Sequence, residues 1–183
     1  MMTHNKMTSD IRRHSFAGTD RFFLDANIWL SVYGPTTSPN WRSRVYSAAL
    51  RDMRTSRCTI CVDVLVLSEF INSFARWEFA QLPRASKPAR FKDFRKSDDF
   101  ADVSKEIAVN ARKIIEQAER YESGFGVVDV AAILAEFESG PHDFNDQIIR
   151  ELCKSGGLTL VTHDADFKGA DIPILTANRR LYT

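Results

Sequence analysis

Short apolar runs alternate with longer amphipathic segments along this chain. Four runs are too short for a helix and predict buried strands, at residues 21–24, 58–62, 158–161 and 172–175. Apolar residues recur at helical spacing in the segments between them, over residues 27–33, 41–55, 63–82, 98–121, 127–138 and 144–155. Strands separated by helices pair in parallel through crossover connections. The pattern therefore predicts an α/β fold, a three-layer α/β/α sandwich around a short, mostly parallel sheet.

Two segments depart from this pattern. Residues 1–19 are polar and lack the apolar core of a signal peptide, so we expect a flexible tail followed by a single domain over residues 20–183. Pro173 interrupts the last apolar run, which favours an edge position for that strand because proline cannot donate a ladder hydrogen bond.

Composition narrows the class of protein. The net charge of the 183 residues is only +1, so any binding to nucleic acid must rely on a local patch. The three cysteines form no disulfide framework, which is typical of a reducing, cytoplasmic compartment. Cys58 and Cys61 have the spacing of a metal or redox pair, but their apolar surroundings favour a buried strand. No apolar run approaches the roughly 18 residues that a membrane span requires.

Four acidic residues stand where the fold would bring them to one edge of the sheet. Asp25 and Asp164 follow predicted strands, and Asp146 opens a predicted helix. Glu69 lies within two turns of the start of another helix and faces either solvent or the site. The carboxyl ends of parallel strands form the cleft of such folds, and the following helices begin there. Capping is the alternative for each acid near a helix start, and for Asp25 taken alone it is favoured.

Carboxylates gathered at one edge repel one another unless a cation joins them. Oxygen ligands suit Mg²⁺ or Mn²⁺, and a bound metal can activate water and neutralise charge on a phosphate. Asp129 is a weaker fifth candidate, because a first-turn or capping role explains it equally well. The sequence contains no recognisable Ser–His–Asp triad and no glycine-rich phosphate loop.

Four motifs in order carry a resemblance to a known family. They are Phe23-Leu24-Asp25-Ala26-Asn27, Leu65-Val66-Leu67-Ser68-Glu69-Phe70, Asn145-Asp146-Gln147-Ile148-Ile149 and Leu160-Val161-Thr162-His163-Asp164-Ala165-Asp166-Phe167. Each motif is weak alone, but the ordered set, from about Arg21 to Leu175, resembles PIN-domain nucleases and most closely the VapC-type toxins of toxin–antitoxin systems.

The resemblance implies a Mg²⁺- or Mn²⁺-dependent endoribonuclease that hydrolyses RNA phosphodiester bonds. It implies four catalytic metal ligands, Asp25, Glu69, Asp146 and Asp164. Asn27 and Thr162 would be supporting polar residues, Asp166 a further candidate ligand, and Asp143 a weaker rival to Asp146. An antitoxin protein and a homodimer are the partners that it implies. An RNA-processing nuclease without a toxin role, and an inactive nucleic-acid-binding module, remain the alternatives.

The chain is longer than compact toxins of this kind, and residues 83–123 would form a helical and basic insertion. Its first part alternates cations with Phe91 and Phe94. A solvated connection anchored by the two rings is the favoured interpretation, and an arm that binds RNA or a partner protein is the alternative. The candidate RNA contacts in this arm are Arg84, Lys87, Arg90, Lys92, Arg95 and Lys96.

Overall fold

The computed structural model describes residues 7–35, 40–140 and 143–182, and the statements below concern these residues. Six strands form one sheet in the order β1-β6-β5-β2-β3-β4, and every neighbouring pair is parallel. The strands are β1 (Thr8–Asp10), β2 (Arg21–Leu24), β3 (Thr59–Val62), β4 (Glu119–Arg120), β5 (Thr159–Val161) and β6 (Ile174–Thr176). The predicted α/β fold around a short parallel sheet is confirmed.

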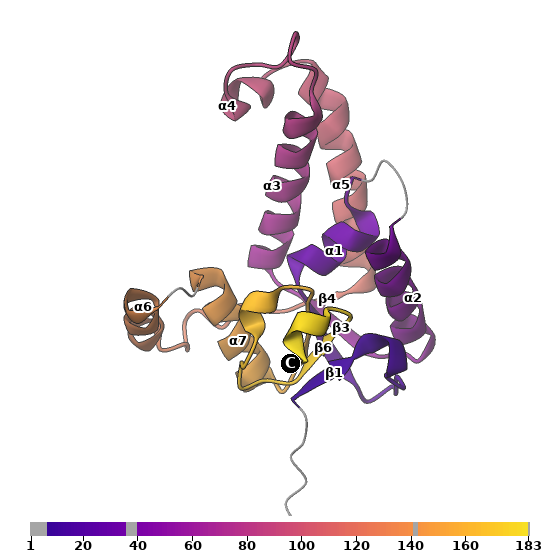
Figure 1. Cartoon of the computed structure of the whole chain (residues 1–183), viewed down its shortest axis with the longest axis vertical. Helices are drawn as coiled ribbons and strands as arrows, with labels where there is room; N and C mark the ends of the chain where they lie inside the picture. The colour runs from indigo at the N-terminus through magenta and orange to yellow at the C-terminus, as the bar shows by residue number, and fades with distance from the viewer. Residues whose placement is uncertain (1–6, 36–39, 141–142, 183) are drawn as a thin grey trace, which may run out of the picture.

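Helices connect the strands and cover the sheet (Figure 1). The α-helices are α1 (Ala26–Tyr33), α2 (Trp41–Thr55), α3 (Val64–Gln81), α4 (Phe91–Phe94), α5 (Asp99–Gln117), α6 (Val130–Ser139) and α7 (Phe144–Gly156). Three short 3-10 helices complete the description, η1 (Ile11–Arg13), η2 (Ala165–Phe167) and η3 (Arg179–Leu181). Helix α7 ends at Gly156 because the next residue, Gly157, adopts a left-handed conformation with a φ of 59°.

The strand order explains the three layers. The chain moves one way along the sheet from β2 to β3 and β4, and then returns to β5 and β6 on the other side of β2. Right-handed crossovers place the helices of these two paths on opposite faces. Accordingly, α1 packs on α2 and α3, α3 packs on α5, and α6 packs on α7. The direction reverses between the neighbours β2 and β5, and a crevice opens at such a switch point beyond the carboxyl ends of the strands.

The amino-terminal segment belongs to the sheet, which corrects the expectation of a flexible tail over residues 1–19. Strand β1 pairs with β6, where Ser9 is in register with Leu175, and Ile11 is buried in the core. Its three residues are all polar, so no apolar run marks this strand in the sequence, and its stability comes from pairing with a distant segment. The pairing also makes β6 an interior strand, so the edge position expected from Pro173 is wrong. Residues 1–6 lie outside the described residues.

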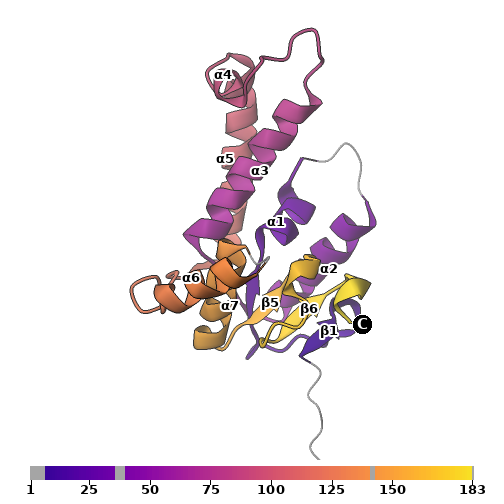
Figure 2. The ribbon, with the colours of Figure 1, turned by 60° about the vertical axis from the view of Figure 1, so that its left-hand side comes forward.

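The segment expected as an insertion, residues 83–123, does not stand apart as a whole. Helix α5 contributes Ile107 and Ile114 to the core. Residues 119–120 form β4 beside β3, where the periodicity predicted the end of a helix. What projects is the far end of the α3–α5 pair with α4 at its tip, as Figures 1 and 2 show. At this tip Phe94 is fully buried and Phe91 is partly buried, so the two rings anchor the connection as expected.

Two further predictions concern the cysteines and membrane-spanning helices. Cys61 is buried within β3, and Cys58, Cys61 and Cys153 are all free thiols. The buried-strand interpretation is therefore confirmed for Cys61 but wrong for Cys58, which precedes β3 and is only partly buried. Among the described helices, none combines the length and the apolar character that crossing a bilayer requires.

Candidate functional site

Asp25 lies at the switch point between β2 and β5. Its backbone N–H donates to the carbonyl oxygen of Val161 (3.0 Å), which extends the pairing of the two strands by one residue. The side chain is only 5% exposed, although it is a carboxylate. Asp25 occupies the N-cap position of α1 but makes no side-chain capping hydrogen bond. The capping role that its position favours is therefore not what its side chain does.

Two polar side chains hold the Asp25 carboxylate instead. The Thr162 hydroxyl donates to Oδ2 of Asp25 (2.7 Å), and the Asn27 amide donates to the same oxygen (2.5 Å). The Asn27 amide nitrogen also lies 3.1 Å from the Thr162 hydroxyl oxygen. Burial raises the pKa of Asp25, the bond from Thr162 opposes this, and the charge of Asp164 adds to the increase. The support expected of Asn27 and Thr162 is thus seen as direct contact with Asp25.

The same two residues position the segment that follows β5. Asn27 Oδ1 accepts from the backbone N–H of His163 (3.0 Å), and the Thr162 hydroxyl accepts from the N–H of Asp164 (3.0 Å). Asp164 then caps η2, because its Oδ1 accepts from the N–H of Asp166 (3.0 Å). Asp25 and Asp164 are therefore joined through Thr162, although they lie 139 positions apart in the sequence.

Asp146 lies in the first turn of α7, close to the other acids. Burial raises the pKa of Asp146 to about 7, and the charges of Asp25, Asp143, Asp164 and Glu69 act in the same direction. Each of those carboxylates disfavours ionisation of Asp146 because like charges repel in a partly dehydrated site. The structure therefore places Asp146 in the electrostatic field of the three other acids expected at this edge.

Glu69 lies in the second turn of α3 and is exposed at the rim. Partial burial removes water from the Glu69 carboxylate and raises its pKa. The charges of Asp25, Asp143 and Asp164 raise this pKa further. Glu69 is therefore exposed and at the same time close enough to the other acids for its charge to act on Asp146. We call Asp25, Glu69, Asp146 and Asp164 the acidic cluster.

Other acids near helix starts serve as caps. The carboxylate of Asp129 accepts from the N–H of Ala132 (3.0 Å), and that of Asp143 accepts from the N–H of Asn145 (2.8 Å). Asp63 likewise caps α3 through the N–H of Val66 (2.8 Å). Capping explains Asp129 without a ligand role, whereas Asp143 both caps α7 and contributes charge to the acidic cluster.

The choice between Asp164 and Asp166 favours Asp164. The charge of Asp164 is among those that raise the pKa of Asp25, Glu69 and Asp146. Asp166 lies two residues further along, with its backbone N–H bonded to the Asp164 carboxylate. Both side chains are exposed, but Asp166 is not among the charges that raise the pKa of Glu69. Its side chain borders two cavities, a larger one shared with Asp164 and a smaller one shared with Asp146.

The donor chemistry of the acidic cluster fits a hard divalent cation. Carboxylate oxygens are what Mg²⁺ and Mn²⁺ prefer, and a cation would relieve the repulsion that raises the pKa of Asp146. A cavity of about 190 Å³ adjoins Asp146 and is also lined by Gln147. Gln147 is only 2% exposed, yet its amide oxygen and nitrogen have no partner among the described residues. In the described ranges, no three His, Cys, Asp or Glu side chains are already arranged to hold a metal.

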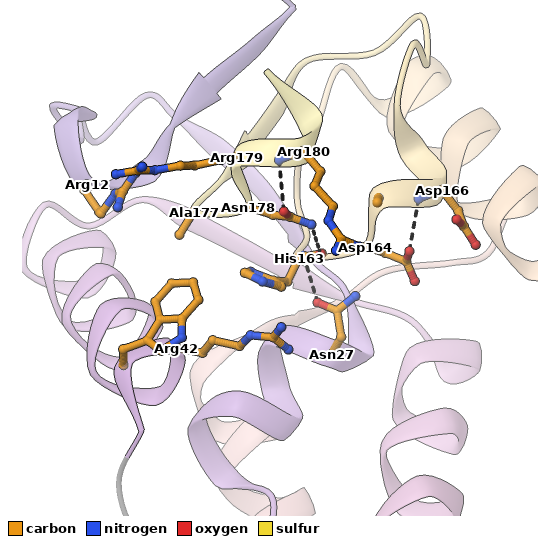
Figure 3. A pocket seen from close by; sticks show the side chains of 12 residues that line it. Arg12, Asn27, Arg42, His163, Asp164, Asp166, Ala177, Asn178, Arg179 and Arg180 are labelled. Carbon is orange, nitrogen blue, oxygen red and sulfur yellow. Dashed lines mark hydrogen bonds between the residues drawn. The ribbon is translucent and has the colours of Figure 1, made fainter. Parts of the chain in front are cut away.

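A second feature beside the acids was not found from the sequence. A cavity of about 860 Å³ extends from Asn27 and Asp164 toward the carboxyl terminus. Figure 3 shows the side chains around it, including four arginines, Arg12, Arg42, Arg179 and Arg180. The sequence places these cations in three distant segments, with arginine pairs at Arg12–Arg13 and Arg179–Arg180 as the available signal. We call this cavity the arginine pocket.

His163 is on the floor of the arginine pocket and belongs to no catalytic dyad with Asp164. Its Nδ1 lies 2.7 Å from the hydroxyl of Tyr46, which also accepts from the N–H of Ala177 (3.0 Å). Because the Tyr46 hydroxyl accepts that bond, it can donate its own proton to Nδ1 of His163. The neutral His163 ring then carries its proton on Nε2. Burial and the charge of Arg42 lower the pKa of His163 and favour this neutral form, while the charge of Asp164 opposes them.

The structure does not bring the basic arm to the acidic cluster. Phe79, which contacts both Phe91 and Phe94 of the arm, lies ten residues beyond Glu69 on α3, or roughly 15 Å along the helix axis. Arg90 is engaged with Asp93 (2.8 Å), and Lys87 donates to the carbonyl oxygen of Ala80 (3.2 Å). The remaining candidates are Arg84, Lys92, Arg95 and Lys96, all exposed at the tip.

Comparison with known proteins agrees with this architecture. A model of the PIN domain family matches residues 22–173. The structure resembles the crystal structure of PAE2754 from Pyrobaculum aerophilum, with a TM-score of 0.50, 15% sequence identity and coverage of 94% of each chain. At this identity the likeness concerns the fold alone. No curated protein matches the sequence.

Proposed function

The chain belongs to the PIN domain family, whose members are generally metal-dependent nucleases, and on this premise we propose that it is a Mg²⁺- or Mn²⁺-dependent endoribonuclease. Its ligands would be the acidic cluster, Asp25, Glu69, Asp146 and Asp164. RNA as the substrate, and these two metals, follow from the resemblance of the four motifs to VapC-type toxins and from the oxygen-only donor set.

One observation carries the proposal. Four segments distant in sequence contribute carboxylates near the switch point of the sheet, where burial, and then the charges of the neighbouring carboxylates, raise the pKa of Asp146 to about 7. A fold gains no stability from such repulsion, so a structural role does not explain the arrangement. A cation at this place would turn the repulsion into attraction.

The residues of the proposed site would have different roles. Asn27 and Thr162 fix the orientation of the Asp25 carboxylate, and Thr162 also fixes the backbone of Asp164. Asp146 and Glu69 approach from helices on the two sides and would complete the ligand set. A metal held there supplies charge neutralisation at phosphorus and a bound water with a lowered pKa. Asp166 remains a further candidate ligand, at the rim.

The test is metal-dependent cleavage of RNA by the purified chain. We expect cleavage with Mg²⁺ or Mn²⁺, none with a chelator, and a loss of at least about 1,000-fold in kcat for Asp146→Asn or Asp25→Asn. Asp129→Asn is the matched control, since it removes a carboxylate from a helix cap outside the cluster and asparagine still caps. Equal cleavage by wild type and Asp146→Asn would show that the acidic cluster is not the catalytic site.

A toxin role is the narrower form of this proposal. It would require an antitoxin protein, and a homodimer would be the expected assembly of the toxin. Expression in cells tests it: we expect growth arrest by the wild type, none by Asp146→Asn, and protection by a small neighbouring gene. Cleavage in vitro without growth arrest would instead favour an RNA-processing nuclease.

A further inference from the structure

The arginine pocket adjoins the acidic cluster and shares residues with it. Its walls come from η1, the start of α2, the end of β5 and the segment from β6 to η3. Asn27 and Asp164 line the pocket and also belong to the Asp25 network. Figure 3 shows Arg12 and Arg179 at one end and Asp164 and Asp166 at the other. A chain molecule lying across the acids would therefore continue into this pocket.

The pocket concentrates positive charge in a chain that is almost neutral. Four arginines line it against two aspartates, while the net charge of the whole protein is +1. Asp10 neutralises Arg12 in part, through a short ion pair of 2.7 Å. Arg42 and Arg179 have no carboxylate within 4.0 Å in the described part of the chain. Two unneutralised guanidinium groups in one pocket favour an anionic ligand with more than one charge.

An aromatic surface accompanies these cations. Trp41, the first residue of α2, is 47% exposed, which is unusual for a side chain of its size. Its ring meets that of His163 at a centroid distance of 5.5 Å and an angle of 64°, and the guanidinium of Arg42 lies 5.8 Å from the Trp41 ring. The indole therefore presents a flat surface at the wall of a cationic pocket.

The floor of the pocket is held in place. Besides the Tyr46 contact to its ring, His163 has its carbonyl oxygen bonded by the Asn178 amide (2.7 Å). Tyr46 is 1% exposed and is fixed in turn by the N–H of Ala177. A ligand entering the pocket would meet a surface that is already ordered, so little entropy would be lost on binding.

Charge, stacking surface and size together identify the ligand class. Phosphate groups suit the arginines, a base suits the exposed indole, and about 860 Å³ is in the range of pockets that take small organic groups. A base within a duplex is already stacked on its neighbours and cannot lie against Trp41. An acidic protein segment would use the arginines but would have no use for a stacking surface.

We propose that the arginine pocket binds an unpaired nucleotide of the RNA substrate, next to the bond that the acidic cluster would cleave, with its base on Trp41 and its phosphates on Arg42 and Arg179. This rests on the proposed function. It makes Trp41 and Arg42 at the start of α2, and Arg179 in η3, the determinants of affinity. The basic arm at the tip of α3 has no part in it.

Equilibrium binding tests the proposal separately from cleavage. The protein is the full chain carrying Asp146→Asn, and the probes are a short fluorescein-labelled single-stranded RNA of mixed sequence and the same RNA as a blunt duplex. Fluorescence anisotropy at several salt concentrations gives Kd and its salt dependence. Arg42→Gln should raise Kd for the single strand about tenfold and reduce the salt slope by about one. Arg44→Gln, two residues along the same helix and outside the pocket, should leave Kd within about twofold.

Trp41→Ala tests stacking, and the exposure of Trp41 makes misfolding an unimportant cause of any loss. We expect Kd for the single strand to rise between about fivefold and about 100-fold, with most of the affinity kept by Trp41→Phe. Kd for the duplex should change by less than about twofold, since a paired base does not reach the indole.

The outcomes separate the two proposals. If wild type fails to cleave RNA but Arg42→Gln and Trp41→Ala still weaken binding as expected, the pocket stands and the nuclease function fails. If Arg42→Gln binds like Arg44→Gln, or if Trp41→Ala weakens duplex and single strand equally, the pocket proposal is wrong whatever the cleavage result. Unchanged RNA affinity in both pocket variants would also overturn it, and would favour an acidic protein ligand.

Discussion

The acidic cluster and the arginine pocket lie side by side at one edge of the sheet but are built differently. The carboxylate of Asp25 is buried and held by two hydrogen bonds, and Asp146 is crowded by like charges. Arg42 and Trp41 of the pocket are exposed, and the cations are spread around a large opening. A buried, fixed group suits chemistry at one atom, whereas exposed cations suit affinity for an extended polyanion. Each of the following experiments weakens or sharpens that contrast.

The largest effect in this comparison should be on RNA cleavage, and it should distinguish Asp164 from Asp166, which lie between the acidic cluster and the arginine pocket. We expect Asp164→Asn to reduce RNA cleavage by about 100-fold or more, because Asp164 shares the field of Asp25, Glu69 and Asp146. Asp166→Asn should reduce cleavage by less than about fivefold, since Asp164 and not Asp166 is among the charges that raise the pKa of Glu69. Initial rates with Mg²⁺ measure both, and asparagine keeps the η2 cap in the first variant. Equal losses would extend the acidic cluster to Asp166.

A smaller effect should appear in the pH dependence of stability. In the folded chain without a divalent cation the pKa of Asp146 is about 7, above its ordinary value of 3.8. The folded state therefore binds this proton more tightly than the unfolded state, and its stabilisation is lost as pH rises from about 4 through about 7. Between about pH 4 and about pH 7, the free energy of unfolding of wild type should fall by on the order of 1 to 2 kcal/mol relative to that of Asp146→Asn, after allowance for solvent screening.

Urea unfolding at several pH values, in the presence of a chelator, measures this difference. Asp129→Asn should keep the slope of the wild type, because Asp129 is a helix cap and not part of the cluster. Added Mg²⁺ should restore stability to wild type at pH 8 and have less effect on Asp146→Asn. Parallel pH profiles for wild type and Asp146→Asn would mean that the repulsion assigned to the acidic cluster is absent.

The smallest effect should come from the tip of the α3–α5 pair. Lys92→Gln, Arg95→Gln and Lys96→Gln combined should change the RNA Kd by less than about threefold, whereas Arg42→Gln alone changes it more. The reason is distance, since the tip begins roughly 15 Å along α3 from Glu69. Anisotropy with the same labelled RNA measures both. A larger loss in the tip variant than in Arg42→Gln would make the basic arm the principal RNA contact.

Local hydrophobic patterns were sufficient to predict most helices and the points at which the central strands end. The range predicted for α2 agrees with the structure to the residue. Strand β1 and the two-residue β4 could not be predicted, because neither has an alternating pattern and both are stabilised by pairing with distant strands. The long helix expected over residues 98–121 ends early for this reason, at Gln117.

The sequence alone determined which chemical groups the site holds, because Asp25, Asp146 and Asp164 each follow a strand or open a helix whose periodicity is legible. It could not decide between a capping and a site role for Asp25, or whether Glu69 faces the acids. The tertiary structure shows that the Asp25 side chain makes no capping bond to α1 and that Glu69 lies close to other acids, because the hydrogen bonds from Thr162 and Asn27, and the charges of neighbouring segments, exist only after β2 and β5 pair. It alone created the arginine pocket, since Arg12, Arg42 and Arg179 meet only when both ends of the chain join the sheet.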